Sequence, residues 1–264
     1  MKSLLLLFTA LMLVATNVRA DPWEMVWSDE FNYEGLPDKT KWDYEEGFVR
    51  NEESQYYTRD RLENARVEHG NLVIECRKES FTPKDHAPVK YTSASLTTLN
   101  RASWRYGRIE VRAKLPKGKG VWPAIWTLGA NFSKVGWPAC GEIDIMELVG
   151  KEPNHIYGTL HYPLSGGKDA NDHGMLETDN PSGDFHIYAV EWDADHVDFF
   201  FDGRKFHTAF TEKAGNGEGN PFHRSHYLIL NFALGGQWGG PIDDAMLPQQ
   251  FLIDYVRVYQ RKAP

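Results

Sequence analysis

The sequence lacks several features that would mark a membrane protein, a nucleic-acid-binding protein or a disulfide-rich protein. Only 2 of its 264 residues are cysteine, so no framework of several disulfides can hold the fold. Basic residues are outnumbered, with 29 Lys and Arg against 37 Asp and Glu, and the net charge is -8. This acidic balance argues against nucleic acid and anionic membranes as partners. After residue 20, no apolar run approaches the roughly 20 residues that span a membrane.

The first twenty residues, MKSLLLLFTALMLVATNVRA, have the pattern of a signal peptide. An apolar run from Leu4 to Val14 is too short for a comfortable membrane span, and Val18-Arg19-Ala20 forms a small-x-small ending before Asp21. We therefore expect cleavage at about Ala20 and a secreted or periplasmic protein. The loss of Lys2 and Arg19 would take the net charge from -8 to -10.

Residues 21–264 show no linker, repeat or charge block, so we expect a single domain, which we expect to be monomeric. Helical periodicity is scarce, whereas alternation with a period of two recurs along the chain. The alternating segments are NLVIEC, YGRIEVRAK, HIYGTLHY, HIYAVEW, HVDFFFDGRKFHTA, HYLILNFAL and FLIDYVRVY. Asp202-Gly203, between two such runs, is a strong hairpin signal.

These strands predict an all-β fold, a jelly-roll sandwich of two antiparallel sheets. An ordinary immunoglobulin-type sandwich needs only about 100 residues, and this chain has 264. The surplus indicates long strands and long loops. Such a sandwich can bend one sheet into a concave surface, so we expect a substrate cleft.

The segment GEIDIMELVG (141–150) contains three acids whose spacing breaks the pattern of a regular strand. Glu142 and Asp144 would point to one face, whereas Glu147 would point to the other, among isoleucines. One extra residue near Ile145 or Met146, a β-bulge, would return Glu147 to the face of the other two acids. The alternative is an ordinary exposed acidic strand face, but that would leave Glu147 facing the core without a visible basic partner.

Three carboxylates on one face of a cleft have a chemical use. Long Glu side chains leaning together can approach the roughly 5 to 5.5 Å separation that a retaining glycosidase requires. Crowded carboxylates cannot all ionise at ordinary cost, so one of them is expected to hold a proton. Glu142, Asp144 and Glu147 are therefore the candidate catalytic residues.

The two cysteines leave two alternatives open. Cys76 shares a strand face with Leu72 and Ile74, which predicts a core position, and Cys140 directly precedes the acidic segment. A single disulfide would require the α-carbons to lie within about 7 Å. Two buried thiols are the interpretation we prefer.

The acidic segment resembles the E-I-D-I-M-E catalytic motif of glycoside hydrolase family 16, in particular its laminarinase branch of endo-1,3-β-glucanases. The resemblance extends over nearly all of residues 21–264, in family order. The matching segments are WSDEFN, NEESQYYT, YGRIEVRAKLPKGKGVWPAIWTLG, YGTLHY, NFALGGQWGG and IDYVRVYQ.

This resemblance implies a β-jelly roll that hydrolyses β-glucan with retention of configuration. It implies Glu142 as the nucleophile, Glu147 as the general acid and base, and Asp144 as a residue that orients the nucleophile. The Ile145-Met146 spacing is the bulged form, whereas the xyloglucan-active branch has one residue fewer. We expect no cofactor for catalysis.

Candidate sugar-binding residues lie outside the acidic segment. Trp122 and Trp126 are four apart, so they share a strand face on which indoles could stack against glucose rings; the alternative is that both are core aromatics. Pro123 indicates an edge or irregular position. Trp238 lies between glycine pairs, and it and Asn51 resemble cleft residues of the family.

His161 is predicted from strand pairing. If a hairpin forms around residues 152–154, His161 lies opposite Glu142 on the cleft face. We expect it to hydrogen-bond the sugar or the acids, the alternative being a solvated histidine.

Members of the family often carry a structural calcium ion, and the corresponding positions here are Glu30, Gly70 and Asp254. Oxygen ligands suit calcium, but Asp254 could equally pair with a neighbouring arginine.

Three alternatives to a 1,3-β-glucanase remain. The same chemistry could act on mixed-linkage 1,3-1,4-β-glucan, as in a lichenase, or on an algal galactan such as agarose or carrageenan. A β-glucan-binding protein without activity is a more distant alternative, because both glutamates are present.

Overall fold

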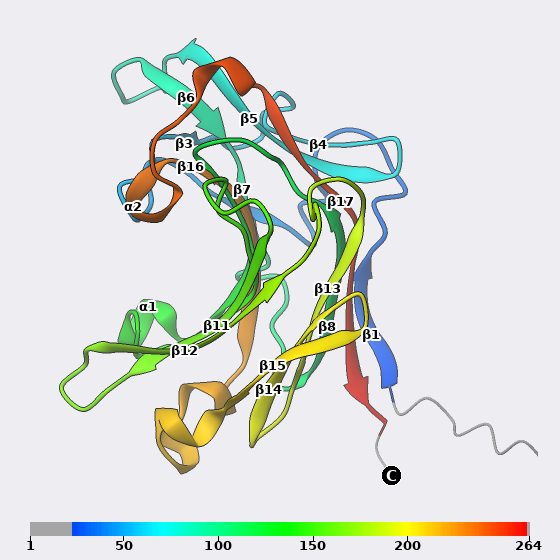
Figure 1. Ribbon diagram of the computed structural model, residues 1–264, viewed down its shortest axis with the longest axis vertical. Coiled ribbons are helices and arrows are strands. Elements are labelled where there is room, and N and C mark those ends of the chain that lie inside the picture. Colours follow the sequence, from blue (N-terminus) through cyan, green and yellow to red (C-terminus); the bar gives the residue numbers. More distant parts are fainter. Residues whose placement is uncertain (1–22, 263–264) are drawn as a thin grey trace, which may run out of the picture.

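A computed structural model describes residues 23–262 of the chain. Two β-sheets pack face to face and curve together (Figure 1), which is the all-β jelly-roll sandwich that the alternating segments predict. The predicted signal peptide, residues 1–20, lies outside the described residues. Over residues 23–262, no helix is both long and apolar enough to cross a membrane.

The larger sheet has ten strands and forms the convex layer. Its main path runs, in spatial order, through β15 (Arg204–Phe210), β14 (His196–Phe201), β13 (His186–Trp192), β8 (Gly107–Lys114), β17 (Gln249–Arg261), β5 (Asn71–Phe81), β6 (Val89–Ser93) and β3 (Tyr56–Tyr57). Two further strands, β1 (Trp23–Asp29) and β4 (Ala65–Glu68), pair with β17 and β5. All of these pairs are antiparallel except that of β3 with β6.

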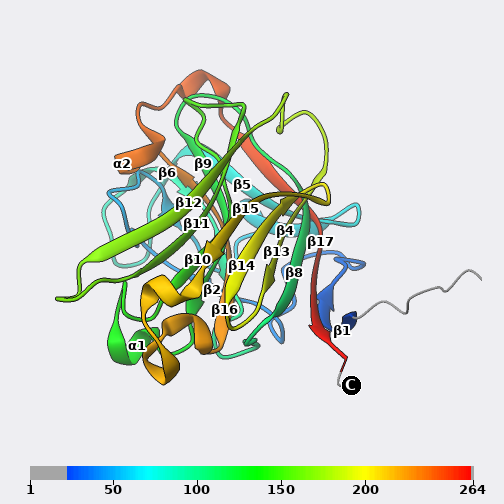
Figure 2. The ribbon, with the colours of Figure 1, turned by 60° about the horizontal axis from the view of Figure 1, so that its bottom comes forward.

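The smaller sheet has seven strands and carries the cleft described below. Its order is β12 (Asp169–Glu177), β11 (His155–Pro163), β10 (Glu142–Glu147), β9 (Val121–Gly129), β16 (His226–Leu234), β7 (Ser95–Thr97) and β2 (Asp43–Glu45). The described helices are short: α1 (Phe132–Val135), α2 (Gly236–Gly239) and 3₁₀ turns at Thr211–Ala214, Gly217–Gly219, Pro221–His223 and Asp244–Met246. Figure 2 shows α1 below the ends of the cleft-bearing strands.

The core lies between the two sheets, because each strand directs alternate apolar side chains inward. Ile109 and Val111 of β8 and Ile143 of β10 belong to this main cluster. Cys76 joins it, whereas Cys140 lies in a smaller cluster with Trp126. Both cysteines are buried and free, which confirms the preferred interpretation of two unpaired thiols.

The predicted hairpin at Asp202-Gly203 is confirmed. β14 and β15 pair up to Phe201 and Arg204, so the turn contains two residues. Both have positive φ, 48° at Asp202 and 76° at Gly203, as a type I′ turn requires.

Of the two expectations for Pro123, an edge or an irregular position, the edge was wrong. Pro123 does not mark an edge, since β9 lies in the interior of its sheet between β10 and β16. Pro123 pairs with Phe232 on one side, and on the other its carbonyl accepts a hydrogen bond from the Leu148 amide at 3.3 Å. The missing N–H is tolerated because β10 ends at this point, with Glu147 opposite Ala124.

Candidate active site

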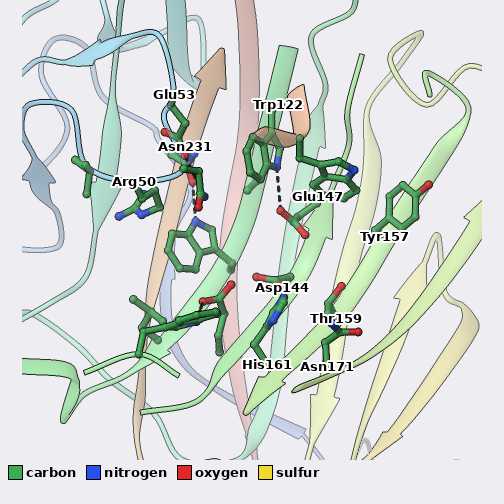
Figure 3. A pocket seen from close by; sticks show the side chains of 18 of the residues that line it. Arg50, Glu53, Trp122, Asp144, Glu147, Tyr157, Thr159, His161, Asn171 and Asn231 are labelled. Atoms are coloured by element: carbon green, nitrogen blue, oxygen red, sulfur yellow. Dashed lines mark hydrogen bonds and ion pairs between the residues drawn. The ribbon is translucent and has the colours of Figure 1, made fainter. Parts of the chain in front are cut away.

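A cleft of about 690 Å³ lies on the seven-stranded sheet. All eight residues predicted to act in catalysis or sugar binding line it: Asn51, Trp122, Trp126, Glu142, Asp144, Glu147, His161 and Trp238. They come from the neighbouring strands β9, β10 and β11, from the loop of Asn51 and from the short helix α2, which carries Trp238. Figure 3 shows Trp122, Asp144, Glu147 and His161 along its floor.

The three acids share this cleft because β10 contains the predicted β-bulge. The register shifts after Asp144 on both sides, by Met146 on the β9 side and by Glu147 on the β11 side. Ile145 and Met146 are 1% and 0% exposed and belong to the core. The bulge therefore moves two apolar side chains inward in succession and returns Glu147 to the cleft.

Each glutamate accepts a hydrogen bond from an indole. Trp122 Nε1 donates to Glu147 Oε1 at 2.9 Å, and Trp137 Nε1 donates to Glu142 Oε2 at 2.8 Å. Asp144 lies between them and is only 2% exposed. Its Oδ2 atom has no hydrogen-bond partner within residues 23–262.

Burial raises the pKa of all three carboxyls, because removal from water disfavours the charged form. The pKa of Glu147 rises to about 7, with the Trp122 hydrogen bond opposing the rise. The pKa of Asp144 is raised well above its usual value by burial and then by the charges of Glu142 and Glu147. Burial also raises the pKa of Glu142, which His161 opposes. These directions agree with the predicted retention of a proton among the acids.

His161 lies where strand pairing predicts, directly opposite Glu142 on β11. Its Nε2 atom is 3.5 Å from Asp144 Oδ2, and its Nδ1 atom is 3.1 Å from Asp169 Oδ2. Asp169 is the first residue of β12 and was not predicted. The imidazole thus contacts one buried carboxylate and one partly exposed carboxylate.

The two tryptophans of β9 differ in what their rings contact. Trp122 packs edge-on against Trp238 with the ring centroids 5.5 Å apart, and it adjoins the general-acid candidate Glu147. Trp126 is 6% exposed and donates to Asn231 Oδ1 at 2.6 Å. The Arg50 guanidinium lies 4.8 Å from the centre of a Trp126 ring. Trp122 is 9% exposed and so nearly as buried as Trp126, whereas Trp238 is partly exposed and offers the most open ring of the three.

The loop that carries Asn51 packs closely against Gly236 and Gln237 of α2. Asn51 and Glu52 both have positive φ, 57° and 54°, a conformation that costs non-glycine residues energy. The Gln237 amide donates to the Asn51 carbonyl at 3.0 Å. A Cβ at Gly236 would lie 2.8 Å from the same oxygen, so only glycine allows this close approach.

Sequence reasoning missed several cleft residues. The structure adds Glu45, Arg50, Trp137, Tyr157, Asn171 and Asn231. Tyr157 could have been found, because it alternates with His161 on one strand face. Arg50 and Trp137 lie in irregular loops, where no periodicity indicates a direction.

At two of the three predicted calcium positions, the carboxylate is paired with an arginine. Arg257 donates two hydrogen bonds to the Glu30 carboxylate at 2.9 and 2.8 Å. Arg112 donates to Asp254 Oδ2 at 2.6 Å, which is the ion pair that the sequence offered as the alternative. Gly70 lies in the turn between β4 and β5. Because Arg112 offsets the Asp254 charge, this geometry favours the ion pair, and calcium binding stays a prediction.

Comparison with known proteins gives consistent matches. The protein-family model described as "Glycosyl hydrolases family 16" matches residues 52–257 of this chain. A "Beta-glucanase" of Rhodothermus marinus is 44% identical over 92% of this chain and 87% of its own length. A "Glucan endo-1,3-beta-glucosidase" of Cryptopygus antarcticus is 38% identical over 89% of this chain and 91% of its own. The solved laminarinase of Rhodothermus marinus, 44% identical, superimposes with a TM-score of 0.82 over 91% of this chain and 98% of that one.

Proposed function

The chain belongs to glycosyl hydrolases family 16, and from this premise we propose that it hydrolyses internal 1,3-β-glucosidic bonds of laminarin-type glucans by double displacement. It is a glycoside hydrolase, and relatives named for β-glucanase and glucan endo-1,3-β-glucosidase activity support an endo-1,3-β-glucanase. The observation that carries the residue assignment is the bulge in β10, which brings two glutamates to one cleft.

The first displacement would form a covalent glycosyl-enzyme. The Glu142 carboxylate attacks the anomeric carbon while Glu147 gives its proton to the leaving glycosidic oxygen. A pKa of about 7 keeps Glu147 protonated in mildly acidic solution, as a general acid requires. The hydrogen bond from Trp137 to Glu142 favours the ionised nucleophile.

The second displacement would release the sugar. Glu147, now ionised, takes a proton from water, and the resulting oxygen nucleophile attacks the anomeric carbon. The bond to Glu142 breaks and its carboxylate is restored. Asp144 lies beside Glu142 and would hold the nucleophile in place, since the two carboxyls can share a hydrogen bond when one is protonated.

The walls of the cleft suit a neutral polysaccharide. Trp122, Trp238 and Tyr157 form an aromatic group beside Glu147, with Tyr157 and Trp238 centroids 5.1 Å apart. Apolar ring faces can pack against the C–H faces of glucose. Asn51 and Asn171 line the same cleft, and their amides can both donate to and accept from hydroxyls.

Product analysis on a panel of polysaccharides tests this function. We expect oligosaccharides of several lengths from laminarin, less from lichenan, and none from agarose or carboxymethyl cellulose. The Glu142→Gln variant serves as the inactive control. Release from agarose alone would contradict the substrate assignment, and binding of laminarin without any products would favour the β-glucan-binding alternative.

We also propose that the protein is exported after cleavage at about Ala20 and acts as a monomer. The support is the signal-peptide pattern of residues 1–20 and the acidic net charge. Determination of the N-terminal residue of the exported protein tests the cleavage site, and light scattering coupled to size exclusion tests the monomer.

A further inference from the structure

Three potential metal ligands meet at the centre of the cleft. Glu142, Asp144 and His161 each offer one ligand atom, and these three atoms lie within 4.8 Å of one another. Among the residues that the structure describes, no other group of three or more His, Cys, Asp or Glu side chains meets at this spacing. Figure 3 shows Asp144 and His161 facing each other across a short gap.

An unsatisfied atom points to a ligand at this place. Asp144 Oδ2 is buried and accepts no hydrogen bond from any described residue. Its nearest ionisable neighbour, His161 Nε2, is 3.5 Å away, which is too long for a good hydrogen bond. A buried carboxylate oxygen without a partner is costly, so a cation between these two atoms would satisfy both.

Asp169 prepares His161 to act as a ligand. The Asp169 carboxylate lies 3.1 Å from Nδ1 of the imidazole, so in the neutral ring the proton resides on Nδ1. The lone pair of Nε2 is then directed toward Asp144. A carboxylate that binds one nitrogen of a histidine while the other nitrogen binds the metal is a common arrangement in zinc sites, and the outer carboxylate fixes the orientation of the ring.

The spacing fits a small tetrahedral ion. Bonds of about 2 Å to a tetrahedral ion place two ligand atoms roughly 3.3 Å apart, and the Asp144–His161 separation is 3.5 Å. Glu142 is the third ligand after a small side-chain shift, which would exchange its hydrogen bond from the 48% exposed Trp137 for a metal bond. The remaining position would face the open cleft.

We propose that Glu142, Asp144 and His161, supported by Asp169, form an inhibitory site for a divalent transition-metal ion of the zinc type. One imidazole and two carboxylates suit zinc, whereas calcium and magnesium prefer oxygen ligands alone and more of them. The bound ion ties up the carboxylate that would attack the sugar. It therefore competes with the polysaccharide, and a chelator restores activity.

Calorimetric titration of the protein with zinc chloride tests binding without reference to activity. We expect one site per chain and a higher Tm in zinc, but no matching effect of magnesium chloride or calcium chloride. In laminarin assays, zinc should raise KM and leave kcat unchanged. Absence of zinc binding, or a fall in kcat at constant KM, would overturn the proposal. Activity measured in chelator tests the proposed hydrolase function separately.

Variants locate the ion. The Asp169→Asn variant should raise the zinc Kd by roughly 10- to 100-fold, as loss of an outer carboxylate does, and His161→Gln should abolish binding. Asp172→Asn is the matched control. Asp172 lies on the same strand as Asp169, but its carboxylate contacts a different histidine, His207, with 3.2 Å between Oδ1 and Nε2. A zinc Kd unchanged in both Asp169→Asn and His161→Gln, each folded by circular dichroism, would refute the site. An equal rise in Asp172→Asn would refute it too.

Discussion

The hydrogen bond from Trp122 to Glu147 should set the upper pH limit of the enzyme. In the Trp122→Phe variant an aromatic ring stays in place, but the N–H that donates to Glu147 Oε1 at 2.9 Å is lost. That donor favours the ionised carboxylate and so lowers the pKa of Glu147, against the burial that raises it to about 7. Its removal must therefore raise the pKa further.

The size of the shift follows from the strength of the bond. A hydrogen bond to a charged group contributes about 1.5 to 3 kcal/mol, and one pKa unit corresponds to about 1.4 kcal/mol. Since Glu147 is partly open to the cleft and water can replace the indole, we expect the lower end, about one unit. The first displacement needs protonated Glu147, so activity should persist to higher pH in the variant.

The pH profile of kcat/KM on laminarin measures this effect. In the parent enzyme the basic limb should fall near the Glu147 pKa of about 7, and in Trp122→Phe it should lie about one unit higher. Trp126→Phe is the control, because Trp126 shares the strand face but donates to Asn231. A basic limb that stays in place or moves lower in Trp122→Phe would refute the reasoning, as would an equal shift in the control.

Three further predictions concern the nucleophile, acid stability and packing. Glu142→Gln should lower kcat by about 10⁴-fold or more on loss of the covalent route, and residual laminarin hydrolysis near the parent rate would exclude Glu142 as nucleophile. Burial lowers the pKa of His226 to about 4, below the value of about 6.5 in the unfolded chain, so the contribution of His226 to the free energy of unfolding is complete above pH 6.5 and is lost as the pH falls toward 4. In urea unfolding between pH 7 and 4, the parent should lose about 3 kcal/mol more of this free energy than His226→Gln does, and equal losses would contradict this. Gly158→Ala would place a Cβ 2.5 Å from the buried Phe199 ring and should lower the free energy of unfolding by about 1 to 3 kcal/mol, whereas Gly219→Ala, with nothing within 4 Å, should have little effect.

The sequence predicted the fold well because burial of one sheet face imposes a period of two. YGRIEVRAK and HYLILNFAL correspond to β8 and β16 almost to the residue. The irregular spacing of the acids also carried information. Only an extra residue after Asp144 could keep Glu147 out of the core, and the register shift lies at that point.

The sequence could not predict contacts made by irregular loops. Arg50 lies over a Trp126 ring from a loop in which Asn51 and Glu52 adopt positive φ, and no composition or periodicity indicates this conformation. Trp137 reaches Glu142 from the segment between α1 and β10. Asp169 reaches His161 only because β12 pairs with β11 in a particular register, with Asp169 opposite Pro163.

The edge assignment of Pro123 failed for a related reason. The rule holds where a neighbouring strand needs the missing N–H. In this sheet β10 ends opposite Ala124, so no such need arises on that side.

The most direct test of the double displacement is the configuration of the first product. Proton NMR of laminarin hydrolysis, recorded faster than mutarotation, separates the α and β anomers of the new reducing end. With Glu142 as nucleophile and Glu147 as acid and base, the β anomer should appear first and the α anomer only later by mutarotation. Initial release of the α anomer would contradict the account of how the two glutamates in the bulged strand act.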